Sequence, residues 1–124
     1  MPADQDTAGP AFDPEDAEDT KLVALARSTR ARIDAAEGAC VRDSYGRTYA
    51  GASVSLASMQ LSAVQVAVAM AVSSGARGLE AAAVVSGEPT INEADLPVVR
   101  DLAGAGVAVH LAAPDGTVIA SVQS

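Results

Sequence analysis

One thiol and one imidazole are the first candidates for chemistry. Cys40 and His110 are the single cysteine and the single histidine among the 124 residues, and a thiol activated by an imidazole can act as a nucleophile. Cys40 lies in a short apolar stretch, and His110 stands between Val109 and Leu111. Both positions suit strand interiors, where cysteine behaves as a small apolar residue. We therefore expect no catalytic dyad, and one cysteine also excludes an internal disulfide and a zinc site made of cysteines alone.

Asn92 and Asp95 are the second candidates, because amide and carboxylate oxygens can bind a hard cation. We expect no third carboxylate near them, so they predict a poor metal site. Their more ordinary role is to cap a helix, either with Asn92 as the N-cap and Asp95 in the first turn, or with Asp95 itself as the cap. The sequence thus predicts no metal ligand and no catalytic residue.

The charge of the chain is concentrated at its start. Sixteen acidic residues against eight basic ones give a net charge of −8, and residues 1–19 hold seven of the acidic residues and no basic one. We expect residues 1–19 to form a disordered acidic leader and residues 20–124 to form one folded domain. Aromatic residues make up 2% of the chain, so a nucleic-acid stacking surface is not expected.

The start of the chain also lacks the features of a targeting signal. It has no basic flank followed by an apolar segment, and no stretch of 18 strongly apolar residues occurs anywhere in the chain. These features predict neither a signal peptide nor a membrane span. Together with the single cysteine, they lead us to expect a cytoplasmic protein.

The elements that must position these side chains follow from spacing and turn residues. A helix is expected from Thr20 to about residue 33, a strand hairpin over 38–41 and 48–54, and a helix over 56–72. A strand over 79–86, a helix from residue 92 or 95 to 103, and strands over 107–112 and 117–122 follow. This order, α-β-β-α-β-α-β-β, predicts an α/β fold with a mixed sheet.

Four short strings in this order resemble the cytidine deaminase family of zinc-dependent nucleoside hydrolases. They are Gly38-Ala39 in the first strand, residues 45–51 across the hairpin, residues 71–75 at the end of the central helix, and Pro114-Asp115-Gly116. The resemblance spans residues 20–122. It implies a three-layer α/β/α fold around a mixed five-stranded sheet.

The resemblance also shows what this chain lacks. The family holds zinc, which lowers the pKa of a bound water from about 16 to about 7, with a Cys/His-Ala-Glu motif and a Pro-Cys-x-x-Cys motif. Here the first ligand position corresponds to Ser62 and the glutamate position to Val64. Asn92 and Asp95 have the spacing of the two cysteines in the second motif, but they are not cysteines. No Cys, His, Asp or Glu occurs between Ser55 and Leu79. Zinc is the cofactor expected for the family, and it is not predicted for this chain.

The resemblance implies a vestigial pocket in place of an active site. The family reads its nucleoside with an Asn and a Glu after the second strand, and these positions hold Ser53 and Ser55. With Gln65, the serines form a polar set that could orient a neutral ligand. The residues predicted to form the vestigial pocket are Ser53, Ser55, Ser62, Val64, Asn92 and Asp95.

Three functions remain open from the sequence. The first is a non-catalytic, self-associating binding or structural module; the alternatives are a divergent nucleoside deaminase and a sensor of a nucleoside or other small heterocycle. Self-association, as a homodimer or homotetramer, is expected because a helix over 56–72 that is apolar on every side exceeds what one sheet can cover. We expect no membrane partner and no nucleic-acid partner.

Overall fold

The computed structural model describes residues 12–124 and contains one five-stranded sheet covered by helices on both faces. Its elements are α1 (Ala17–Arg32), β1 (Glu37–Asp43), β2 (Thr48–Ala52), β3 (Val54–Leu56), β4 (Met59–Leu61), α2 (Ala63–Ser73), β5 (Leu79–Ser86), α3 (Asp95–Ala103), β6 (Ala108–Ala112) and β7 (Val118–Gln123). The strand order is β2-β1-β5-β6-β7. The β5 and β6 strands are parallel, and every other neighbouring pair is antiparallel. The predicted mixed five-stranded sheet in an α/β fold is confirmed.

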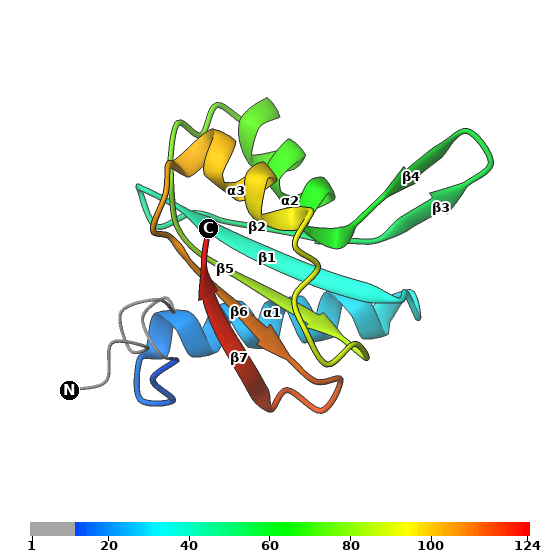
Figure 1. Cartoon of the computed structure of the whole chain (residues 1–124), viewed down its shortest axis with the longest axis horizontal. Helices are drawn as coiled ribbons and strands as arrows, with labels where there is room; N and C mark the ends of the chain where they lie inside the picture. The colour runs from blue at the N-terminus through cyan, green and yellow to red at the C-terminus, as the bar shows by residue number, and fades with distance from the viewer. Residues whose placement is uncertain (1–11) are drawn as a thin grey trace.

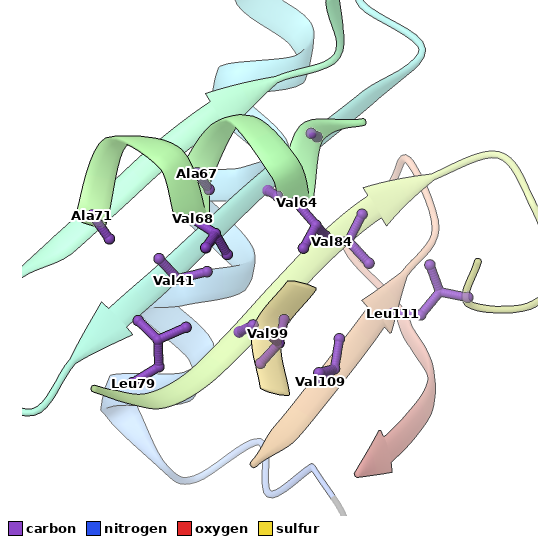
Figure 2. Close-up of a cluster of buried hydrophobic side chains, with 13 residues drawn as sticks. Val41, Val64, Ala67, Val68, Ala71, Leu79, Val84, Val99, Val109 and Leu111 are labelled. Carbon is purple, nitrogen blue, oxygen red and sulfur yellow. The ribbon is translucent and has the colours of Figure 1, made fainter. Parts of the chain in front are cut away.

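The three layers come from alternation along the strands. Helix α1 covers one face of the sheet, and α2 and α3 cover the other (Figure 1). Within β1, Ala39 and Val41 contribute to the core under α2 and α3, whereas Cys40 contributes to the core under α1. Figure 2 shows the first of these cores, with Val64 of α2 among its buried side chains. Each face of the sheet therefore buries every second residue.

Glycine permits the close approach of α2 to the sheet. A Cβ atom at Gly51 in β2 would lie 2.7 Å from Cγ1 of Val66 and 2.9 Å from the backbone nitrogen of Ala67. Neither neighbour can give way easily, because both belong to a helix that is already packed. The close packing of α2 on β2 therefore requires a residue without a Cβ atom at position 51.

The segment predicted as the start of the central helix is a hairpin. The expected helix over 56–72 is wrong before residue 63, because β3 and β4 pair from Val54↔Leu61 to Leu56↔Met59 and project from the body of the domain (Figure 1). Apolar and polar residues alternate along both strands, which is the period of a strand. Helix α2 then starts at Ala63. The side chain of its N-cap, Ser62, accepts from the backbone N–H of Gln65 in a capping box, which is a strong signal for a helix start.

Helix α1 begins earlier than expected. It starts at Ala17, and the side chain of Asp16 caps it by accepting from the backbone N–H groups of Glu18 and Asp19. Residues 12–19, which we expected in the disordered leader, are therefore part of the described structure: residues 17–19 lie in α1, and Phe12 packs against the core under α1. Residues 1–11 lie outside the described residues, so the rest of that expectation stays a prediction.

Asp19 ties the start of α1 to the sheet. Its Oδ1 lies 3.0 Å from a terminal nitrogen of Arg42 on β1, and its Oδ2 lies 3.0 Å from Nε2 of His110 on β6. His110 is 1% exposed, and Phe12 packs edge-on against its ring. The carboxylate of Asp19, which we expected in the leader, therefore holds the start of α1 against the sheet.

None of the helices among residues 12–124 has the length and apolar content needed to cross a membrane.

Truncation distinguishes the two parts of the first 19 residues. We expect deletion of residues 1–11 to leave the melting temperature within a few degrees of the full chain, because those residues contain no large apolar side chain except Met1. Deletion of residues 1–19 removes the cap and leaves Arg42 and His110 without Asp19, so the melting temperature should fall by at least about 5 °C, from a loss of roughly 1–2 kcal/mol. Thermal denaturation followed by circular dichroism measures both.

The substitution Asp19→Asn in the full chain is the matched control. It should reproduce a large part of the loss without shortening the helix. If the 1–19 deletion melts at the temperature of the full chain, the contacts of Asp16 and Asp19 contribute nothing to stability.

Candidate functional site

A cavity of about 290 Å³ opens where β5 and β6 end. Its apolar wall consists of Val84, Ile91 and Leu111. Its polar lining consists of Glu37, Ser86, Glu88, Thr90, Asn92 and Asp95. Ligands of α/β proteins commonly bind outside the carboxyl ends of parallel strands, because loops and helix N-termini meet there. This cavity is therefore the candidate functional site.

Ser62 and Asp95 join the two helices that border the cavity. Ser62 is the N-cap of α2 and Asp95 is the first residue of α3. The Ser62 hydroxyl donates to Oδ1 of Asp95 at 2.7 Å, although the two residues are 33 positions apart. The hydroxyl oxygen also accepts from the backbone N–H of Gln65 at 3.1 Å, so one serine caps α2 and holds α3.

Glu37 brings a second carboxylate to the same place. It begins β1, and its Oε1 lies 3.4 Å from the backbone nitrogen of Ala63, which donates to it at the N-terminus of α2. Burial raises the pKa of Glu37, the Ala63 N–H opposes that shift, and the negative charges of Asp95 and Glu88 raise the pKa further. Burial also raises the pKa of Asp95, against the lowering effect of the Ser62 hydrogen bond.

The predicted pocket residues separate into three groups. Asn92 and Asp95 line the cavity, and Ser62 bonds directly to Asp95. Val64 is fully buried in the core and presents no polar group to the site.

Ser53 and Ser55 lie outside the cavity. Ser53 accepts from the backbone N–H of Glu37 at 3.1 Å, and so it supports the start of β1 from the end of β2. Ser55 is exposed on the projecting hairpin. Gln65 completes the capping box of α2 with a bond from the backbone N–H of Ser62. These three residues have local structural roles.

The expected place of Asp95 in the first turn of α3 is confirmed, whereas the N-cap role expected for Asn92 or Asp95 is wrong. The N-cap of α3 is Ala94, with no side-chain cap. Asn92 instead accepts from the backbone N–H of Ala94 in the turn before the helix. Asp95 is 3% exposed and bonds to Ser62, so its side chain turns toward the cavity.

Sequence reasoning missed the other carboxylates. We expected no third carboxylate near Asn92 and Asp95, but Glu37 and Glu88 line the same cavity. Glu37 lies 55 positions before Asn92, and only the antiparallel pairing of Glu37 with Ser86 at the end of β5 brings it there. The available signal in the sequence was Glu37 itself, a charged residue at the start of an apolar strand.

The imagined dyad of Cys40 and His110 does not form. The two ring nitrogens of His110 bond to Ser121 at 2.7 Å and to Asp19 at 3.0 Å. Burial raises the pKa of the Cys40 thiol to about 11, so the thiol stays protonated and unreactive near neutral pH. Both residues lie on the α1 side of the sheet, and both serve the structure.

Replacing Asp95 tests whether its burial costs stability. A raised pKa in the folded state means that the folded chain holds the proton more tightly than the unfolded chain. Stability therefore falls as the pH rises from the ordinary aspartate pKa through the raised value, and it stays lower at neutral pH. Asp95→Asn retains an oxygen that can accept from Ser62, so we expect its melting temperature at pH 7 to exceed the wild-type value by a few degrees. The difference should disappear below the ordinary pKa of aspartate.

Ser62→Ala is the companion variant, and its effect has the opposite sign. It leaves a buried carboxylate without its donor, which costs about 1–3 kcal/mol. Thermal melts of both variants across pH give the comparison. A melting temperature of Asp95→Asn below wild type at pH 7 would show that the carboxylate stabilises the fold.

Solved structures that share this architecture include cytidine deaminases. The chain superposes on the enzyme from Burkholderia pseudomallei with a TM-score of 0.70 at 23% identity, covering 79% of this chain and 87% of that one. It matches the enzyme from Mycobacterium leprae with a TM-score of 0.66 at 16% identity, covering 83% and 90%. The enzyme from Mycobacterium tuberculosis gives 0.65 at 22% identity, covering 76% and 85%. At these identities the likeness establishes the fold.

No curated protein matches the sequence. The family model described as cytidine deaminase-like matches residues 15–116, which is most of the chain and includes every residue that lines the cavity. On that match, together with the shared fold, the chain belongs to the cytidine deaminase-like family.

Proposed function

We propose that this chain is a non-catalytic cytidine deaminase-like protein that binds a small ligand in the cavity and associates with itself. The observation that carries the proposal is the 2.7 Å hydrogen bond between Ser62 and Asp95. These residues correspond to two of the zinc-ligand positions implied by the resemblance. In this chain a hydrogen bond from the hydroxyl of Ser62 to the carboxylate of Asp95 joins the two positions directly.

The residues at the site do not fit the zinc of the family. A zinc site needs thiolates, imidazoles or carboxylates at about 2.0–2.3 Å in a tetrahedral set, and the three positions hold Ser62, Asn92 and Asp95. Among residues 12–124, no group of three His, Cys, Asp or Glu side chains is arranged to hold a metal ion. Val64, at the general acid/base position, cannot transfer a proton.

The cavity itself supports the binding part of the proposal. Its volume of about 290 Å³ is at the lower end of the range for small-molecule sites, which is about 300–1,000 Å³. Its lining combines apolar side chains with carboxylates, hydroxyls and an amide. Such a site can bury the face of a small ring and orient its polar edge, so the ligand class we propose includes small heterocycles.

A divergent hydrolase is the second candidate, and Glu37 is the observation that favours it. A general acid or base works best when its pKa lies near the working pH, and the pKa of Glu37 is raised by burial and by neighbouring carboxylates. In that function Glu37 would be the general acid or base, the role of the family's glutamate, whose position holds Val64 in this chain. The same assay tests both candidates.

We expect the purified chain to contain less than stoichiometric zinc and to release no ammonia from cytidine or deoxycytidine. Elemental analysis after dialysis and an ammonia assay measure the two quantities, with the Mycobacterium tuberculosis cytidine deaminase as the positive control. One tightly held zinc per chain, or ammonia release that chelation abolishes, contradicts the proposal. Ammonia release that resists chelation and is lost in Glu37→Gln supports the second candidate.

Self-association is supported by apolar side chains that one copy leaves uncovered. Leu56 and Met59 face each other across the projecting hairpin and are 57% and 46% exposed. A two-stranded hairpin is marginally stable in water on its own. On α2, Met70 and Val72 are also exposed, so the central helix is covered on one side only. A second copy can bury these side chains.

The expected result is a dimer or tetramer of the 12.3 kDa chain at tens of micromolar, measured by size exclusion with light scattering. Met59→Arg should shift it toward monomer, because a charge would enter a dry interface. Ala24→Arg, on the exposed side of α1, is the control. Gln65 is unsuitable for the same test because its side chain closes the α2 capping box.

A well-folded monomer across the whole concentration range would contradict self-association. Dissociation by Ala24→Arg as readily as by Met59→Arg would place the interface away from the hairpin.

A further inference from the structure

We propose that the cavity takes a small organic cation whose charge is carried by N–H groups, such as an amidinium, a guanidinium or a protonated amine. The inference rests on the proposed ligand-binding function and names the chemistry of that ligand. It departs from a neutral nucleoside, because the strongest polar groups of the cavity are acceptors with negative charge.

Two carboxylates each use one oxygen and leave the other free. Asp95 accepts from Ser62 with Oδ1, and Glu37 accepts from the Ala63 N–H with Oε1. Among the described residues, the second oxygen of each forms no hydrogen bond. Asp95 is 97% buried by residue area, since 3% of it is exposed, and both residues line the cavity. Two acceptors therefore face a space that a donor can occupy.

Within residues 12–124, none of these carboxylates forms an ion pair with a cationic side chain. The ion pairs formed within residues 12–124 all involve Asp19 of α1 or Glu80, which lies near the start of β5, whereas the cavity lies near the end of that strand. Glu37, Glu88 and Asp95 thus share one cavity without an ion-pair partner in the described part of the chain. An unpaired carboxylate is costly to bury, and the raised pKa values of Glu37 and Asp95 express that cost. A bound cation would remove it.

The spacing of the acceptors favours an organic cation over a metal ion. Within the part of the chain that the structure describes, these carboxylates are not grouped closely enough to ligate one metal. A planar cation with several N–H groups can reach separated acceptors. The apolar wall of Val84, Ile91 and Leu111 suits the carbon skeleton of such a ligand.

A buried hydroxyl adds to the cavity's polar lining. Ser86 is 4% exposed, and its oxygen accepts from the backbone N–H of Glu88 at 3.1 Å. It therefore orders the loop that carries Glu88 beside the cavity. This loop places the third carboxylate in the lining of the cavity, close enough to raise the pKa of Glu37.

Benzamidine and benzamide are a matched pair of probes for the full chain. They share a planar shape, and at neutral pH benzamidine carries a positive charge that benzamide lacks. Titration of each into ¹⁵N-labelled protein reports the dissociation constant and the backbone amides that respond. We expect benzamidine to bind about tenfold or more tightly than benzamide, since hydrogen bonds to charged groups are the stronger ones, with the largest shifts among residues 84–95.

Three variants locate the charge that is responsible. Asp95→Asn and Glu37→Gln should each weaken benzamidine binding by about tenfold and leave benzamide binding unchanged. Glu93→Gln removes an equal charge from an exposed neighbour that does not line this cavity, and it should leave both constants unchanged. A general attraction of cations to this acidic chain would instead respond to all three variants alike.

The outcomes separate the two proposals. Equal binding of benzamidine and benzamide at residues 84–95, or binding of cytidine there with no response to benzamidine, overturns the cation assignment and keeps the binding function. Benzamidine shifts elsewhere on the chain, equal losses in Glu93→Gln, or displacement of benzamidine by micromolar zinc or magnesium also overturn the assignment. No response of these amides to benzamidine, benzamide or cytidine overturns the ligand-binding function itself.

Discussion

The hydrogen bond between Ser62 and Asp95 fixes the geometry of the whole site. It joins the N-terminus of α2 to the N-terminus of α3 at 2.7 Å, and the same serine oxygen closes the α2 capping box. The first backbone N–H of α2, at Ala63, is thereby held where Glu37 accepts from it. The cavity wall and two of its carboxylates therefore depend on one hydroxyl.

The sheet separates two uses of buried charge. On the α1 side, Asp19 is matched by Arg42 and His110, so each charge or polar nitrogen has a partner and the network holds α1 in place. On the other side, Glu37 and Asp95 each accept one hydrogen bond, and among the described residues no carboxylate that lines the cavity forms an ion pair. Paired buried charges are a structural feature, whereas unpaired ones with shifted pKa values are typical of functional sites.

Much of the fold was predictable because its signals are local. The turn at Asp43–Gly46, the strand over Leu79–Ser86 and the end of α3 at Gly104 follow from turn residues and from the period of apolar residues. The hairpin of β3 and β4 was missed because an uncharged, apolar stretch was assigned to one long helix. The start of α1 was missed because acidic residues were attributed to a leader, although Asp16 and Asp19 each make contacts that only the folded chain shows.

The site was predictable only in part, because it is assembled from distant segments. The resemblance placed Ser62 and Asp95 at two different zinc-ligand positions of the family, and the structure brings the two residues into contact. Glu37 and Glu88 have no local signal, since their approach depends on β1 pairing with β5. A carboxylate without a cationic partner lowers the stability of the fold, and such a cost is expected where function needs the group. In the function that we propose, Ser62, Asn92 and Asp95 stand at the zinc-ligand positions that the resemblance implies, and the cavity lined by carboxylates serves recognition by charge.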